Sequence, residues 1–314
     1  MTARGRAARA GAVAGWCLFA TAMGILCWRL VGPRGASALD RIQLRGGYAL
    51  AAVACFGGFY AAQAFGWVFL ITAQGQPLAR HAGVTLWLRS NVLRYLPGKL
   101  WSLGGRVAMA MRAGVHGGVA ASSLVLEVVL SIVAMGILSL ANASEWTRAW
   151  PAYCIAAPLI ACVHPRVLDL LVRVASRVLR RDDSAHRVRL SPAVWARALA
   201  IYLGGGVLQG TGTMLTACAV FPIAWTDAPL VIGASATAWL LGALSPLSPA
   251  GIGVREGALA AILSVWLPPS IAVTVAVAAR VTATAGELGC MLVALLSRTA
   301  AFARSKRACD EATR

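Results

Sequence analysis

Long apolar runs alternate along this chain with short stretches rich in arginine. A helix of about 20 consecutive apolar residues is long enough to cross the hydrocarbon core of a bilayer. Because no water reaches that core, each crossing segment must pair its own backbone amides, and a helix does so. The pattern therefore predicts membrane helices over residues 11–31, 47–73, 117–141, 150–163, 195–220, 230–247, 257–267 and 272–296.

These runs predict an all-α integral membrane protein, a polytopic helical bundle of about eight spans that forms one transmembrane domain over residues 1–314. Two runs, 150–163 and 257–267, are short for a full crossing. The segment 80–112 differs from the others because it mixes arginine and lysine with leucine, tryptophan and valine. Such mixing is typical of an element that lies in the interface or dips into it, so we expect a broken or re-entrant helix there.

Composition and charge agree with a lipid environment. Hydrophobic residues make up 59% of the chain and charged residues 13%, whereas soluble domains carry about a quarter charged residues. The net charge of +18 does not indicate a nucleic-acid partner, because the basic residues lie between apolar runs, as the positive-inside rule predicts. That rule places both termini, with their basic tails 1–10 and 298–314, and the segments 74–116 and 164–198 on the cytoplasmic side of the inner, or cytoplasmic, membrane. The basic 33–45 loop, which would face outward, departs from this scheme.

The residue types that carry chemistry form no recognisable catalytic or metal-binding motif. The eight cysteines lie mostly inside apolar runs, without a CxxC pair and without clustering near the four histidines, which is typical of small buried hydrophobic residues. The sequence also lacks the HExxH, GxSxG and P-loop patterns. We therefore expect no metal, no cofactor and no catalytic residue, and a transporter rather than an enzyme.

The first candidate site is a proline-glycine-basic motif inside the 80–112 segment. Proline and glycine interrupt a helix and leave backbone amides unpaired. Basic side chains beside such amides create a concave site that binds anions. The residues of this predicted site are Arg94, Pro97, Gly98, Lys99 and Arg106.

A second motif lies between the runs 230–247 and 257–267. Its prolines and glycines cannot continue a straight helix, and a helix that restarts near Val254 would point the positive end of its dipole at the interruption. Transporters place substrate sites at such interrupted helices, although an ordinary interfacial turn is the alternative for either motif alone. The residues of this second site are Pro249, Gly251, Gly253, Arg255 and Glu256.

Three ionisable residues lie inside apolar runs: Glu127, Arg280 and Glu287. Each costs about 2.5–3.5 kcal/mol at the centre of a membrane helix on insertion scales, so an unpaired charge would be unfavourable. Because Glu127 and Arg280 lie at similar depths from opposite sides, we predict an ion pair between them. Glu287 lies two helical turns from Arg280 and faces the same way. Such a pair would either lock two helices together or contact the substrate.

At these same residues the sequence resembles the lysylphosphatidylglycerol synthase transmembrane, or flippase-like, family. The resemblance is carried by RYLPGKLW from Arg94, by Arg106 and Glu127, and by SPAGIGVREGAL from Ser248, and it covers about residues 45–298. It implies a polytopic helical protein that moves lipid across the cytoplasmic membrane. The best understood members carry aminoacylated phosphatidylglycerol and are fused to a soluble synthase domain. This sequence shows no such domain, so we expect that it does not make the lipid itself, and it has Ser-Pro-Ala-Gly where the family usually has Pro-Gly-Gly.

The sequence therefore predicts a flippase for an anionic phospholipid or for a lipid-linked substrate, such as a polyprenyl phosphate or a glycolipid. Glu127 and Glu256 would balance the charge of the basic residues. The side chains expected to bind the phosphate are Arg94, Lys99, Arg106 and Arg255. The hypothesis requires Lys99 and Arg255 to face one shared cavity. One alternative is a membrane-embedded transferase with Glu127 or Glu256 as base, and another is a scaffold that binds a glycosyltransferase or synthase partner.

Overall fold

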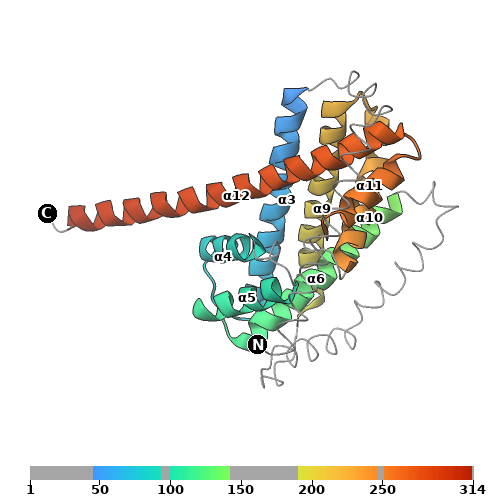
Figure 1. The fold of residues 1–314 in the computed structure, drawn as a ribbon. Coiled ribbons are helices and arrows are strands. Elements are labelled where there is room, and N and C mark those ends of the chain that lie inside the picture. Colours follow the sequence, from blue (N-terminus) through green and yellow to red (C-terminus); the bar gives the residue numbers. More distant parts are fainter. Residues whose placement is uncertain (1–44, 93–98, 142–189, 246–250, 313–314) are drawn as a thin grey trace, which may run out of the picture.

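The computed structural model describes residues 45–92, 99–141, 190–245 and 251–312, and of residues 92, 99–103 and 298–312 it describes the backbone alone. Within these ranges the chain is all helical. The predicted spans 11–31 and 150–163 lie outside the described residues, so the count of eight spans stays a prediction. The helices shown in Figure 1 are, in chain order, α3 (Gly46–Ala73), α4 (Arg80–Val92), α5 (Lys99–Arg112), α6 (Gly117–Ser139), α9 (Pro192–Val220), the 3-10 turn η3 (Trp225–Asp227), α10 (Ala228–Leu244), α11 (Val254–Leu263) and α12 (Pro269–Ala312).

Within the described residues, four helical segments are long and apolar enough to cross a membrane. They are α3, α6, the combined segment Trp225–Leu244, and the part of α12 from Pro269 to Ser297. Helix α9 has 29 residues, which also suffices for a crossing, but its glycines and buried polar side chains lower its hydropathy. These helices confirm the predicted helical membrane fold, and α12 continues well beyond the other helices (Figure 1).

Two pairs of helices that follow each other in the chain form helical hairpins. Helices α4 and α5 have 13 and 14 residues and rise about 20 Å each, less than the roughly 30 Å of a hydrocarbon core. They pack against each other as the first hairpin, and α10 and α11 pack as the second hairpin. Helix α11 has 10 residues and rises only about 15 Å. The run 257–267 therefore makes no full crossing, which corrects its place among the predicted spans.

Helices α3 and α9 form an antiparallel pair at the centre of the bundle (Figure 1). The backbone N–H of Arg45, before α3, donates to the carbonyl of Ala219 near the end of α9. Along the pair, two large rings each cover a glycine of the opposite helix. A Cβ on Gly66 would lie 2.7 Å from Cζ of Tyr202, and a Cβ on Gly212 would lie 3.0 Å from Cδ2 of Phe56. A side chain at Gly66 would force the Tyr202 ring to move, and one at Gly212 would press against the Phe56 ring.

These contacts repeat with a constant offset along the chain. Phe56 matches Tyr202, Gln63 matches Gln209 and Gly66 matches Gly212, each 146 positions later (56 to 202, 63 to 209, 66 to 212). The same ring-on-glycine contact is therefore made twice, once in each direction. This is the pattern expected of two similar halves related by a two-fold axis.

The order of helices carries the same repeat. A long helix, a hairpin of two helices and another long helix form both the first half, α3 to α6, and the second half, α9 to α12. In each half every helix packs on the next, and the first packs on the last. Because α3 and α9 run antiparallel, the two halves are inverted with respect to each other, so the two hairpins begin at opposite ends of the central helix pair.

Candidate functional site

A buried ion pair joins the first hairpin to α6. The Nη1 atom of Arg106 on α5 lies 2.6 Å from Oε2 of Glu127 on α6. Arg106 is 8% exposed and Glu127 is 6% exposed. A hydrogen bond between two charged groups at this distance is among the stronger ones in proteins. The hairpin is therefore fixed to the long helix by paired rather than isolated charge.

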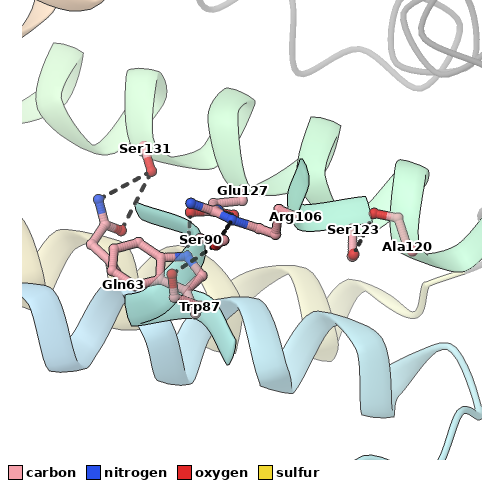
Figure 2. Close-up of polar contacts among 8 residues, drawn as sticks. All are labelled: Gln63, Trp87, Ser90, Arg106, Ala120, Ser123, Glu127 and Ser131. Atoms are coloured by element: carbon pink, nitrogen blue, oxygen red, sulfur yellow. Dashed lines mark hydrogen bonds and ion pairs between the residues drawn. The ribbon is translucent and has the colours of Figure 1, made fainter. Parts of the chain in front are cut away.

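Helix α4 completes this cluster, as Figure 2 shows. The indole Nε1 of Trp87 donates to Oε1 of Glu127 at 2.8 Å, and Nε of Arg106 donates to the hydroxyl of Ser90 at 2.8 Å. The guanidinium also lies 4.9 Å from the ring centroid of Trp87, within the range of a cation–π contact. Both carboxylate oxygens of Glu127 thus have a donor, as a buried charge requires.

The second hairpin has its own ion pair, with α12. Nε of Arg280 lies 3.6 Å from Oε1 of Glu256, and Oε2 of Glu256 accepts from the backbone N–H of Gly253 at 2.6 Å. Glu256 is therefore held at the first turn of α11, where a carboxylate is favoured by the helix dipole. Oε1 of Glu256 and Nη2 of Arg280 are buried and form no hydrogen bond with any described residue. Unlike the first pair, this pair leaves hydrogen-bonding capacity unused.

The two ion pairs join equivalent helices in the two halves. Each joins the second helix of a hairpin to the long helix that follows it, α5 to α6 in the first half and α11 to α12 in the second. Their polarity is reversed, because the hairpin supplies the cation Arg106 in one half and the anion Glu256 in the other. Each half therefore carries one ion pair between corresponding helices, with the charges reversed.

The predicted ion pair between Glu127 and Arg280 is wrong. Glu127 pairs with Arg106 and Arg280 pairs with Glu256. Each charge finds its partner inside its own half, because each hairpin lies beside the long helix that follows it. Glu287 faces the first hairpin, where its Oε1 accepts from Nδ2 of Asn91 at 2.7 Å.

Helix α12 connects both hairpins. Arg280 contacts the start of α11, and Glu287 contacts the end of α4. The two positions are seven residues apart, which corresponds to about 10 Å along a helix. The ends of the two hairpins that carry the predicted motifs are therefore both anchored to one short stretch of α12.

The structure describes the remaining predicted site residues to different extents. Gly251 and Gly253 have φ angles of +71° and +86°, which other residues rarely adopt, so both are needed for the turn into α11. Arg255 lies in the first turn of α11, against Gly242 of α10. Lys99 begins α5, but its side chain lies outside the described residues, so the cavity it would share with Arg255 stays a prediction. Arg94, Pro97, Gly98 and Pro249 lie outside the described residues altogether.

Sequence reasoning missed the polar face of α4. Trp87, Ser90 and Asn91 share one face because residues three and four apart are neighbours on a helix. The sequence signal that could have revealed this face is the spacing of three and four residues between these polar groups in the segment 80–112. In the described part of the chain, no three His, Cys, Asp or Glu side chains are grouped so that they could hold a metal ion.

Comparison with known proteins identifies the family. The family model for the lysylphosphatidylglycerol synthase TM region matches residues 10–286. No curated protein matches the chain significantly. The family match covers most of the sequence, including both hairpins and both ion pairs, and it agrees with the all-helical membrane fold. The chain therefore belongs to the lysylphosphatidylglycerol synthase TM region family.

Proposed function

We propose that this protein moves a lipid across the cytoplasmic membrane, either an anionic phospholipid or a lipid-linked substrate such as a polyprenyl phosphate or a glycolipid. The family suggests a role in lipid synthesis or transport. The observation that carries the proposal is the inverted repeat with one short hairpin in each half. Inverted repeats with interrupted helices are a common architecture of secondary transporters, in which the halves rock to expose a central site to either side.

The second ion pair supplies the group that would bind the phosphate. Arg280 is held near Glu256 at 3.6 Å and keeps a buried Nη2 without a hydrogen-bond partner among the described residues. Phosphate oxygens are the acceptors that an arginine binds best. Binding would let Arg280 exchange a loose contact with Glu256 for a stronger one with the lipid.

The first ion pair has a different part in this mechanism. Arg106 already donates to Glu127 and Ser90 and lies over Trp87, so it keeps the first hairpin closed in this conformation. Because the halves are inverted, movement of the second hairpin toward α12 would be matched by opening of the first. As the lipid headgroup passes between the leaflets, the Arg106–Glu127 pair and the Arg280–Glu256 pair would then close in turn, one forming while the other opens.

The test is lipid movement in liposomes that contain the purified full chain. Fluorescent phosphatidylglycerol, a fluorescent polyprenyl phosphate and fluorescent phosphatidylcholine are each placed in one leaflet, and their arrival in the other is followed by quenching. Arg280→Gln removes one charge-assisted hydrogen bond to the lipid, worth about 1.5–3 kcal/mol. We therefore expect the variant to move lipid roughly tenfold to a hundredfold more slowly than the wild type.

The matched control is Val281→Ala. Val281 follows Arg280 on α12 and is 64% exposed, so its truncation should leave the rate within about twofold. If no anionic lipid or polyprenyl phosphate moves faster than in protein-free liposomes, the transport proposal is refuted.

One observation favours a second function, a membrane-embedded transferase. Oε1 of Glu256 is buried and forms no hydrogen bond with a described residue, so it could accept a proton from a substrate hydroxyl. Glu127 is less suited to this role because both of its oxygens are occupied. Product formation by the purified protein that is lost in Glu256→Gln but kept in Glu127→Gln would support this alternative.

A further inference from the structure

A basic pocket lies on the first hairpin, away from both ion pairs. It has a volume of about 340 Å³ and lies between α4 and α5. On α4, His81, Thr85 and Arg89 follow each other at intervals of four residues and so form one stripe of the helix. On α5, Arg112 and Met109 provide the opposite wall.

No carboxylate among the described side chains neutralises the arginines of this pocket. No acidic residue lines it, and both Arg89 and Arg112 are exposed. Neither arginine forms an ion pair with a carboxylate in the described ranges. Two guanidinium groups that face one cavity repel each other, and an anion between them would remove that repulsion.

The fold itself does not require these cations. By the offset of 146 positions, residues 81–89 of α4 correspond to residues 227–235 at the start of α10. Those residues include Asp227 but no lysine or arginine. If the repeated fold needed basic residues at this place, both halves would carry them. Only the first half does, so the basic pocket is not a requirement of the fold.

We propose that this pocket binds the phosphate of a lipid headgroup before the lipid reaches the ion pairs. The inference rests on the proposed function. Arg89 and Arg112 would bind the phosphate oxygens, and Leu86 and Met109 would contact the first carbons of the acyl chains. The pocket lies on the side predicted to be cytoplasmic, where membranes carry anionic lipids. Arg89 directly precedes Ser90 and Asn91, which bond to Arg106 and Glu287, so the pocket and the anchors of the first hairpin share one turn of α4.

The test is equilibrium binding to the full chain in nanodiscs of phosphatidylcholine. The probes are a fluorescent short-chain phosphatidic acid, its phosphatidylcholine counterpart and inorganic phosphate as competitor. The double variant Arg89→Gln/Arg112→Gln should weaken binding of the phosphatidic acid at least about tenfold, because two charge-assisted contacts are lost. Arg80→Gln is the matched control, since Arg80 is an exposed arginine on the same helix that does not line the pocket.

The outcomes separate the sources of the phosphate. Weak competition by inorganic phosphate, together with the loss in the double variant, supports a lipid headgroup. Competition by inorganic phosphate at concentrations similar to the lipid would instead assign a free-phosphate site and overturn the headgroup proposal. If Arg80→Gln weakened binding of the phosphatidic acid as much as the double variant does, the binding would depend on general positive charge. That result would also overturn the headgroup proposal. Unchanged elution and helical circular dichroism confirm that each variant is folded.

The result also separates this proposal from the transport proposal. Binding that depends on both arginines, in a protein that moves no lipid in liposomes, would retain the pocket and refute transport. Lipid movement that is lost in Arg280→Gln, with phosphatidic acid binding unchanged in Arg89→Gln/Arg112→Gln, would retain transport and refute the pocket.

Discussion

Replacing Glu127 by glutamine removes one charge from the buried ion pair of the first half and keeps the size of the side chain. Arg106, which is 8% exposed, would then be a buried cation without a counter-ion. Breaking a buried pair from one side costs about 3–5 kcal/mol. The amide oxygen of glutamine can still accept from Trp87 or Arg106, so we expect a loss of about 3 kcal/mol in the free energy of unfolding for Glu127→Gln.

The double variant Arg106→Gln/Glu127→Gln tests the reason for this loss. Two neutral amides can hydrogen-bond to each other, and neither leaves a buried charge behind. We therefore expect the double variant to be more stable than Glu127→Gln, with a coupling energy of about 2–3 kcal/mol between the two positions. Glu256→Gln should cost only about 1–2 kcal/mol, because glutamine still accepts from Gly253 and the Arg280 side chain is 19% exposed.

The measurement is reversible unfolding in mixed micelles with increasing sodium dodecyl sulfate, followed by circular dichroism. Arg112→Gln is the charge control, because its exposed side chain should change stability by no more than about 0.5 kcal/mol. A Glu127→Gln protein as stable as the wild type, or additive losses in the double variant, would refute the view that this pair is a coupled, desolvated unit.

Three further predictions concern the helix contacts. Gly66→Ala should destabilise the protein by about 1–3 kcal/mol, because its Cβ would lie 2.7 Å from the buried ring of Tyr202. Gly136→Ala on α6 is the control and should leave the stability unchanged, because a Cβ there meets nothing within 4 Å. Equal unfolding curves for the two variants would contradict the packing. Glu287→Leu should lower the free energy of unfolding by about 1–3 kcal/mol, because it leaves Asn91 without its acceptor, whereas Glu287→Gln should lower it less. Thermal unfolding in detergent compares the two variants, and equal melting temperatures would argue against the hydrogen bond between Asn91 and Glu287. Thr282→Val should lower stability by about 0.5–1.5 kcal/mol through loss of the 2.9 Å contact between the hydroxyls of Thr282 and Thr216; the same assay applies, and a stabilised variant would show that this contact is not formed.

Much of the fold could be predicted because the bilayer restricts it so strongly. The run 47–73 corresponds to α3 (Gly46–Ala73) and the run 117–141 to α6 (Gly117–Ser139), since helix length must match membrane thickness. The interruptions were also predictable, because proline and glycine end helices wherever they occur together.

The inverted repeat could not be predicted in the same way. The two halves have only a few residues in common at the repeat positions, such as Gln63 and Gln209, or Gly66 and Gly212. Most of the other matched positions are apolar, and one apolar residue can replace another against lipid without changing the fold. Recognising the repeat required the contact between α3 and α9, which fixes the register of one half against the other.

The ion pairs show a second limit of the sequence. The rise per residue gives the depth of a charge along a helix, and it placed Glu127 and Arg280 at similar depths. Depth does not say which helix lies beside that charge. Arg106 was assigned to the phosphate site because it follows a proline-glycine motif, yet the packing of α5 on α6 makes it the partner of Glu127.

The charges of the two hairpins bear on what an inverted scaffold can do for an anionic lipid. The segment 80–112 contains six arginine or lysine residues and no acidic residue, whereas the segment 225–263 contains Asp227, Arg255 and Glu256. We therefore expect an anionic headgroup to bind more tightly at the first hairpin than at the second, although the backbone framework of the two is similar. In the proposed transport this difference would set which site fills at the lower lipid concentration. It does not set the final distribution of lipid between the leaflets, because a carrier that binds the same lipid at both ends must obey one equilibrium constant for the whole crossing. If the protein transports lipid as proposed, net movement in one direction thus requires either a coupled energy source or removal of the lipid after it crosses, and the unequal hairpins would by themselves supply only the preferred side of entry.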